Sequence, residues 1–263
     1  MYGILGSVRF RQAKNKLALK SYDKALLLNP LDAISHLNKS LVLESLGRID
    51  ESLESINEGI GLNPVIPKAY LQRAGLYSKK SKYREAFEDY DHALSIDSKF
   101  VEAHNNKGAL YSDLGRMREA LSSYDKAIQI EPGSAHIHYN KALANASLGH
   151  FDEAIKGHEK ALELDPTHGQ AYHSLSNLTS LKPTNPLVAN SLNLIADANM
   201  SNDSKVPFLF ALGKIYEVAG DYDTSFSYLE KGNLNKNTLL SFNFQNYVHT
   251  LSLIHISEPT RRT

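Results

Sequence analysis

The chain has 263 residues with 29 acidic and 29 basic residues, so its formal net charge is zero. Binding of nucleic acids or anionic membranes relies on an excess of Lys and Arg, so this balance disfavours both classes of partner. The chain has no cysteine, which excludes disulfides, a thiolate nucleophile and cysteine-ligated zinc.

The first predicted element, residues 1–32, is a degenerate or truncated first copy of a repeat. Its Pro30 is the first of five residues spaced by 34, and the other four are Pro64, Ser98, Pro132 and Pro166. Arg9 occupies a position of the repeat that is normally bulky, which is why this copy counts as degenerate. The N-terminus has no signal-peptide pattern, and no stretch is long and apolar enough to span a bilayer, so a cytoplasmic location is predicted.

Four regular repeats with this period follow over residues 33–168. In each one, two stretches with apolar residues at helical spacing flank a short break, which predicts an antiparallel helix pair. Gly47, Gly115 and Gly149 stand at the break, where a left-handed helix end favours glycine, and Ser81 takes that place in the second repeat. The periodic prolines end the second helices, because proline cannot continue a helix.

Small side chains recur where the two helices of a repeat must come closest. They occupy the eighth position (Ser40, Ala74, Gly108, Ala142), the twentieth (Ser52, Ala86, Ala120, Ala154) and the twenty-seventh (Gly59, Ala93, Ala127, Ala161). Bulky residues alternate with them, as Tyr70, Tyr77 and Tyr90 do in the second repeat. This pattern closely resembles that of the tetratricopeptide repeat (TPR) family. The resemblance implies an all-α fold, a right-handed α-solenoid of stacked antiparallel helix pairs.

The repeat register weakens after Pro166. Residues 169–205 are predicted to form an irregular helical spacer, because Pro183 and Pro186 interrupt it. A further TPR-like unit is expected over residues 206–239, followed by a C-terminal helix over residues 240–250. Residues 251–263 suit a disordered terminus and resemble tails of conceptual translations that include adaptor DNA, so we expect this tail to be non-native or disordered and the chain to be truncated.

Residues 165–250 resemble the TPR region that precedes the catalytic domain in TPR-sulfotransferase proteins. This resemblance implies an alternative function, in which the chain is the N-terminal, substrate-presenting part of a truncated sulfotransferase. The phosphosulfate-binding loop of that family does not occur in the sequence, nor does any other catalytic motif. The chain by itself is therefore predicted not to be an enzyme, and to need no cofactor or metal.

The candidate binding residues lie on the first helix of each repeat. The sixth position of each regular repeat is an amide (Asn38, Gln72, Asn106 and Asn140). An amide side chain can pair with both the N–H and the C=O of a peptide. This column resembles the asparagine ladder of the O-linked N-acetylglucosamine transferase, which implies binding of an extended peptide or partner protein in a concave groove. Neighbouring positions would add selectivity: Leu37, Leu71, Asn105, Tyr139, His173 and Asn177. The alternative is that the amides only bridge neighbouring helices.

Other polar columns are expected to be structural. Lys39, Arg73, Lys107 and Lys141 recur at the seventh position, where long basic side chains pack along a helix and keep the charge in solvent. His36, His104 and His138 occupy the bulky fourth position, which packing explains, so no metal site is predicted. Helical-repeat RNA recognition is a less favoured function because of the neutral charge. The oligomeric state stays open.

Overall fold

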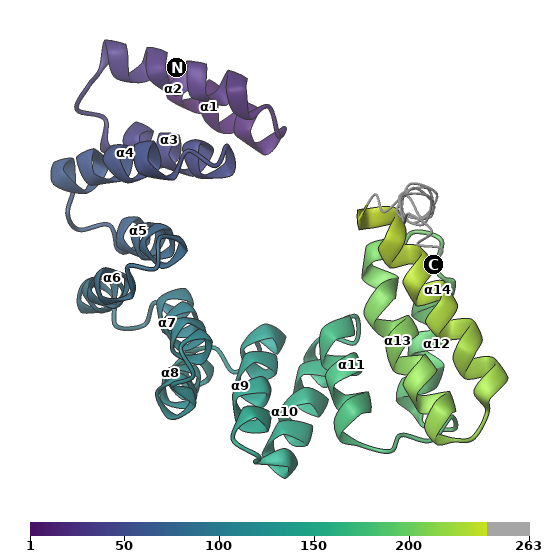
Figure 1. The fold of residues 1–263 in the computed structure, drawn as a ribbon. Helices are drawn as coiled ribbons and strands as arrows, with labels where there is room; N and C mark the ends of the chain where they lie inside the picture. Colours follow the sequence, from purple (N-terminus) through teal and green to yellow (C-terminus); the bar gives the residue numbers. More distant parts are fainter. Residues whose placement is uncertain (241–263) are drawn as a thin grey trace, which may run out of the picture. The chain divides into compact units, whose positions relative to one another are not determined.

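A computed structural model describes the backbone of residues 1–240 and the side chains of residues 1–236, and all of the regular structure described is α-helical (Figure 1). The chain divides into two compact units, Met1–His150 and Phe151–Thr263. The boundary falls inside the predicted fourth repeat. The predicted C-terminal helix over 240–250 and the tail over 251–263 lie outside the described residues, apart from Leu240.

The first unit is a stack of helix pairs. Its first helices are α1 (Tyr2–Arg11), α3 (Ala33–Ser45), α5 (Pro67–Lys79), α7 (Val101–Asp113) and α9 (Ala135–Ser147). Its second helices are α2 (Asn15–Leu28), α4 (Ile49–Leu62), α6 (Tyr83–Ile96) and α8 (Met117–Ile130). The bounds of α2, α4, α6 and α8 fall at the same positions of successive repeats, so the sequence period is the structural period. The predicted all-α stack of helix pairs is confirmed.

A left-handed residue joins the two helices of each complete pair in the first unit. Gly47 and Gly115 have φ values of 73° and 74°, and Ser81 and Ala13 have φ values of 56° at the equivalent places. Glycine adopts this conformation without a steric penalty, whereas serine and alanine carry one. Serine at position 81, in place of the glycine of other repeats, therefore keeps the left-handed backbone conformation at the break, as the sequence pattern predicts.

A side chain near the start of each of α3, α5, α7 and α9 forms a hydrogen bond with the backbone of the preceding loop. The side chain at the fourth position contacts the backbone oxygen six residues earlier, in three cases that of a proline. The pairs are His36 with Pro30 (3.0 Å), Tyr70 with Pro64 (3.1 Å), His104 with Ser98 (3.0 Å) and His138 with Pro132 (3.0 Å). Ser98, which replaces the expected proline, thus supplies the same acceptor. These histidines bond as well as pack, a role that their position alone did not predict.

In the pairs α1/α2, α5/α6 and α7/α8, the core forms where a small residue on the first helix faces a tyrosine ring on the second. In α3/α4 the second helix carries Ile56 at this position. The Tyr22 ring lies against Gly6, and a Cβ on Gly6 would approach it to 2.8 Å. Gly108 is equally close to Tyr124, at 2.8 Å. Tyr22 and Tyr124 are 1% and 2% exposed. Ala74 holds the same position in its own pair and is fully buried in the cluster that contains Tyr90.

The second unit consists of α10 (Phe151–Leu164), α11 (Gly169–Leu178), α12 (Pro186–Ala196), α13 (Asn202–Val218) and α14 (Tyr222–Leu240). The predicted break at Pro183 and Pro186 separates α11 from α12, and the Asn185 side chain caps α12 through Leu187 N–H (2.9 Å). Helix α13 contacts α11, α12 and α14. It begins at Asn202, and the Ser201 side chain caps it by accepting from Ser204 N–H (3.2 Å).

None of the described helices is long and apolar enough to cross a membrane.

Candidate functional site

One face of the first helices in the first unit carries no fully buried side chains at two of its repeat positions. The sixth and ninth positions are half-buried or exposed, whereas the third, eighth and tenth are buried from α3 to α9. Residues three apart lie on one side of a helix, so the sixth and ninth positions form one strip along each first helix. We call the eight residues at these positions in α3, α5, α7 and α9 the first-helix strip: Asn38, Leu41, Gln72, Gly75, Asn106, Ala109, Asn140 and Leu143.

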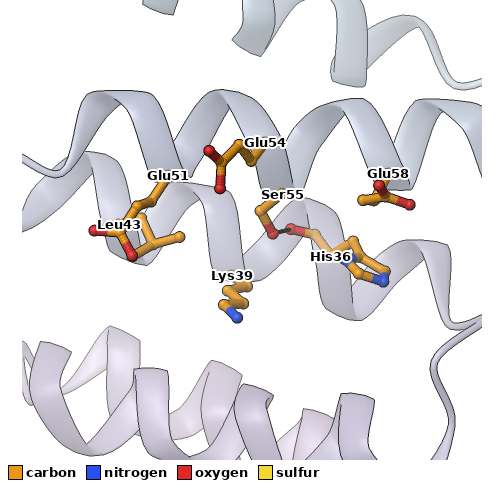
Figure 2. Close-up of a pocket in the computed structure, with 7 residues that line it drawn as sticks. All are labelled: His36, Lys39, Leu43, Glu51, Glu54, Ser55 and Glu58. Atoms are coloured by element: carbon orange, nitrogen blue, oxygen red, sulfur yellow. Dashed lines mark hydrogen bonds between the residues drawn. The ribbon is translucent and has the colours of Figure 1, made fainter.

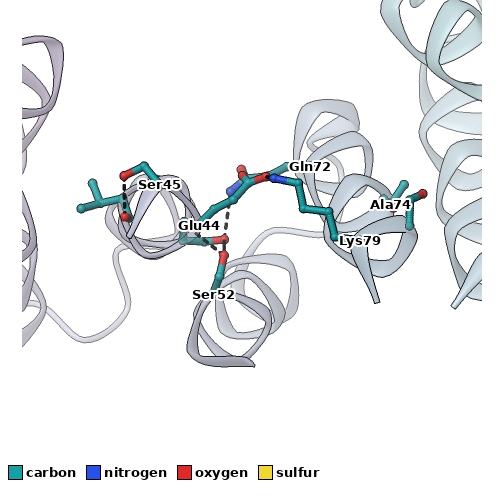
Figure 3. A network of polar contacts seen from close by, with 9 residues as sticks. Glu44, Ser45, Ser52, Gln72, Ala74 and Lys79 are labelled. Atoms are coloured by element: carbon teal, nitrogen blue, oxygen red, sulfur yellow. Dashed lines mark hydrogen bonds and ion pairs between the residues drawn. The ribbon is translucent and has the colours of Figure 1, made fainter. Parts of the chain in front are cut away.

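The four predicted amides of this strip do not behave alike. Gln72 Nε2 donates to Ser40 Oγ on the preceding first helix (2.9 Å), and Ser40 Oγ in turn meets Ser52 Oγ (2.8 Å), a network in which Figure 3 shows Gln72 and Ser52. Asn140 Nδ2 donates to Asn105 Oδ1 on the preceding first helix (3.0 Å). Gln72 and Asn140 thus bridge neighbouring first helices, which was the structural alternative for this column.

Asn38 and Asn106 keep more of their hydrogen-bonding capacity. Asn106 is exposed, and its Oδ1 accepts only from the adjacent Asn105 Nδ2 (3.2 Å), while its own Nδ2 donates to no described group. Asn38 is half-buried and forms no side-chain hydrogen bond within the described part of the chain. The donors of these two amides are the ones available to a ligand.

The remaining predicted residues of the first unit differ in exposure. Leu37 is only 8% exposed and packs against Gly59 and the core around Ile56, so it belongs to the core and not to an accessible surface. The Leu37 side chain faces α4, and the spacing of residues in the sequence did not reveal this orientation. Leu71 is half-buried against the same core, and Asn105 and Tyr139 are also half-buried.

The residues at the ninth positions of α5 and α7, Gly75 and Ala109, have little or no side chain, so the helix backbone is more accessible there. Gly75 is helical, and a Cβ built on it meets nothing within 4 Å. Alanine is favoured over glycine inside a helix by about 0.8–1 kcal/mol. We therefore expect Gly75→Ala to raise the free energy of unfolding of the first unit by about 0.5–1 kcal/mol in urea titrations. A loss of stability would show that a neighbour occupies this space.

The predicted basic column pairs with acidic residues of neighbouring helices. Lys39 lies 2.8 Å from Asp23 and Lys141 lies 2.5 Å from Asp125, and Lys107 pairs with Asp91 in the same way. Each of these pairs joins a first helix to the preceding second helix, at one constant separation along the sequence. Partly exposed pairs of this kind stabilise by at most about 1 kcal/mol each, and the three lysine charges already face carboxylates of the protein.

Arg73 is the exception in this column, because its partner is buried. Arg73 donates to both carboxylate oxygens of Asp89 (2.8 and 2.7 Å), and Asp89 is 5% exposed. The hydrogen bond to Asp89 raises the pKa of Arg73 above its ordinary value. A third bond reaches Asn57 (2.8 Å), which stands where α2, α6 and α8 carry aspartate. Sequence reasoning did not identify Asp89 or Asn57. The constant separation of 16 residues was a usable signal for Asn57, whereas Asp89 is the only acidic residue at its position in the four regular repeats.

A cavity of about 390 Å³ lies on α3 and α4, between His36, Lys39 and Leu43 on one side and Glu51, Glu54, Ser55 and Glu58 on the other (Figure 2). Its inner polar groups already have partners. His36 contacts Pro30, Lys39 contacts Asp23, and Ser55 Oγ donates to the His36 backbone oxygen (2.9 Å). Among the described residues, no group of three or more potential ligands could hold a metal ion.

In the second unit, His173 and Asn177 lie one turn apart on α11, with Asn177 Nδ2 at 3.5 Å from His173 Nε2. Burial lowers the pKa of His173. His173 also lines a cavity of about 450 Å³ whose apolar wall is Val206, Pro207 and Phe210 of α13. The chain thus offers a polar strip in the first unit and a separate, more apolar cavity in the second.

Sequence profiles of the tetratricopeptide repeat family match residues 5–65 and 75–115, and the two consecutive segments 101–134 and 135–168. No curated protein matches the chain in sequence.

The fold is similar to several solved structures. A tetratricopeptide repeat protein from Parabacteroides merdae has a TM-score of 0.63 at 18% identity, with 88% of this chain and 91% of that chain covered. MamA has a TM-score of 0.56 at 23% identity (61% and 94% covered). YrrB, described as a TPR protein with an unusual peptide-binding site, has a TM-score of 0.51 at 19% identity (80% and 97% covered). At such identities the similarity concerns the fold.

Proposed function

Because the chain belongs to the tetratricopeptide repeat family, we propose that it is a protein interaction scaffold whose first-helix strip binds an extended segment of a partner protein. The observation that carries this proposal is the pair of available amides, Asn38 and Asn106, on a strip whose side chains are half-buried or exposed. An amide can pair with the main chain of a peptide whatever its side chains are. A protein in the same fold class, YrrB, is described as having a peptide-binding site, which agrees with such a role.

The small residues Gly75 and Ala109 support an extended ligand over a folded one. Because these residues have little or no side chain, the helix backbone is accessible between the turns that carry the amides, and a peptide main chain can approach it. Leu41 and Leu143 flank this stretch and would contact apolar side chains of the ligand. A few bidentate contacts and one apolar anchor are enough for micromolar binding, which corresponds to about −8 kcal/mol.

The test is selection of binders from a random linear peptide library on the full chain, followed by titration of a selected peptide against variants. We expect the double variant Asn38→Ala/Asn106→Ala to weaken binding about ten-fold or more, because each amide contributes about 1 kcal/mol of net hydrogen bonding. Gly75→Trp should block the strip sterically, while Gly75→Ala should bind almost as the parent does.

Gln72→Ala is the matched control, because Gln72 uses its side chain to bridge to Ser40. Its effect should appear in stability more than in affinity. If the double amide variant and Gly75→Trp bind the selected peptides as tightly as the parent, the strip is not the binding surface. The sulfotransferase association predicted from residues 165–250 stays a prediction, to be tested by sulfonate-donor turnover with the full gene product.

A further inference from the structure

The outward face of α2 combines lysines with exposed leucines. Lys16, Lys20 and Lys24 are spaced by four residues, which places them on one face of the helix, and all three are exposed. Leu17, Leu27 and Leu28 lie among them and are 45%, 82% and 73% exposed. Within the described residues none of the three lysines forms an ion pair, although Lys24 lies 5.6 Å from the centre of the Tyr2 ring.

The same positions of the next second helix, α4, are acidic. Asp50, Glu54 and Glu58 stand one full repeat after Lys16, Lys20 and Lys24, and Glu51 lies beside them. All four are exposed, and α4 has no basic residue. Asp50 pairs with Lys80 and Glu51 with Arg48, whereas Glu54 and Glu58 have no ion-pair partner in the described chain.

Among the second helices of the first unit, only α2 and α4 carry this combination of charged faces and exposed leucines. At the same positions, α6 carries Arg84, Glu88 and His92, so its signs are mixed. Helix α8 carries Arg118, Ser122 and Lys126, which is a weaker basic face interrupted by a neutral residue. Neither helix exposes a leucine pair comparable to Leu27 and Leu28, and neither has an acidic face to meet the lysines of α2.

We infer that the outer faces of α2 and α4 form a self-complementary interface through which two copies of this chain associate. A two-fold axis between α2 and α4, running along them, places α2 of each copy over α4 of the other. A rotation about such an axis keeps the height along the helices. Lys16, Lys20 and Lys24 therefore meet the partner's Asp50, the partner's Glu54 and the partner's Glu58, which occupy the same repeat positions.

The apolar side chains argue for a protein partner of this geometry. Leu27 and Leu28 are exposed next to the lysines, and contact with a second helix would remove them from water. Charge complementarity sets the register and raises the association rate, and it makes the dimer sensitive to salt. This surface is distinct from the first-helix strip, so a dimer leaves that strip accessible.

The experiment is analytical ultracentrifugation of the full chain at about 0.05 M and about 0.5 M salt, where screening lengths differ about three-fold. We expect a concentration-dependent dimer at low salt whose dissociation constant rises about ten-fold or more at high salt. Lys20→Glu/Lys24→Glu should abolish the dimer, and so should Glu54→Lys/Glu58→Lys. Circular dichroism should show the helicity of the parent in both variants, because all four side chains are exposed.

The decisive step is to mix the two reversed variants. In the mixed dimer each reversed α2 faces a reversed α4, and each original α2 faces an original α4, so association should return. Arg118→Glu/Lys126→Glu is the matched control, with the same charge change on the outer face of α8, and should dimerise as the parent does. A monomeric parent, reversed variants that still dimerise, a mixture that stays monomeric, or growth into open oligomers would each overturn the inference.

Discussion

Replacing Tyr124 with alanine is expected to lower the free energy of unfolding by about 3–5 kcal/mol, as for other large aromatic side chains removed from a core. Tyr124 is 2% exposed and packs in a cluster with Ala120, Ala127 and Ile137, so its ring joins α8 both to its own pair and to α9. Burial raises the pKa of Tyr124 to about 12, which agrees with a phenol that is largely removed from water. Urea titration of parent and variant would measure the loss.

A surface tyrosine gives the control for this prediction. Tyr222 is 71% exposed, and Tyr222→Ala should change stability by no more than about 0.5 kcal/mol. The complementary change is Gly108→Val, which should cost about 1–3 kcal/mol because its new atoms meet the Tyr124 ring. Gly108→Ala should be milder, since Ala74 holds that position in the preceding pair. Equal losses for Tyr124→Ala and Tyr222→Ala would contradict the burial argument.

The fold could be predicted because the same physical constraint recurs in every repeat. The break at Ser81 has a φ of 56°, although neither glycine nor proline stands at that turn. Its position in the repeat was therefore enough to predict the turn. Repetition averages out local exceptions such as Ser98 in place of proline, because the acceptor that His104 needs is a backbone oxygen present in any residue.

The binding residues could be predicted only as a column. Periodicity places Asn38, Gln72, Asn106 and Asn140 on equivalent turns, but whether an amide is available depends on its neighbours in the adjacent repeat. Gln72 is bonded because Ser40 is a serine, and Asn140 because Asn105 precedes it. Such contacts join side chains of successive repeats, so they follow from the stacking geometry and not from the local sequence.

His158 in the second unit is a buried histidine that the sequence prediction did not identify. It occupies the twenty-fourth position, where earlier second helices carry Tyr22, Ile56, Tyr90 and Tyr124. It is fully buried, and burial together with nearby His168 lowers its pKa to about 4. The register reveals a titratable group in a bulky, mostly aromatic column, but the sequence prediction did not consider His158.

The second large effect expected is a loss of stability in acid that depends on His158. The folded state keeps its imidazole neutral down to about pH 4, whereas in the unfolded chain it gains a proton near pH 6.5. Between these values the unfolded state binds more protons, so the free energy of unfolding falls as the pH falls. The contribution is complete above pH 6.5 and falls by about 1.4 kcal/mol per pH unit, a loss that reaches about 3 kcal/mol near pH 4.

The measurement is urea unfolding of the parent and of His158→Leu at pH 7 and pH 5. An aliphatic side chain suits the site because Ile56 holds the same position in α4. From pH 7 to pH 5 the parent should lose about 2 kcal/mol more than the variant. Any change in packing affects the variant equally at both pH values and cancels in this difference, as do the carboxylates that both proteins share. If both lose the same stability, protonation of the unfolded state at His158 does not drive the acid sensitivity, and the imidazole must already accept its proton in the folded chain.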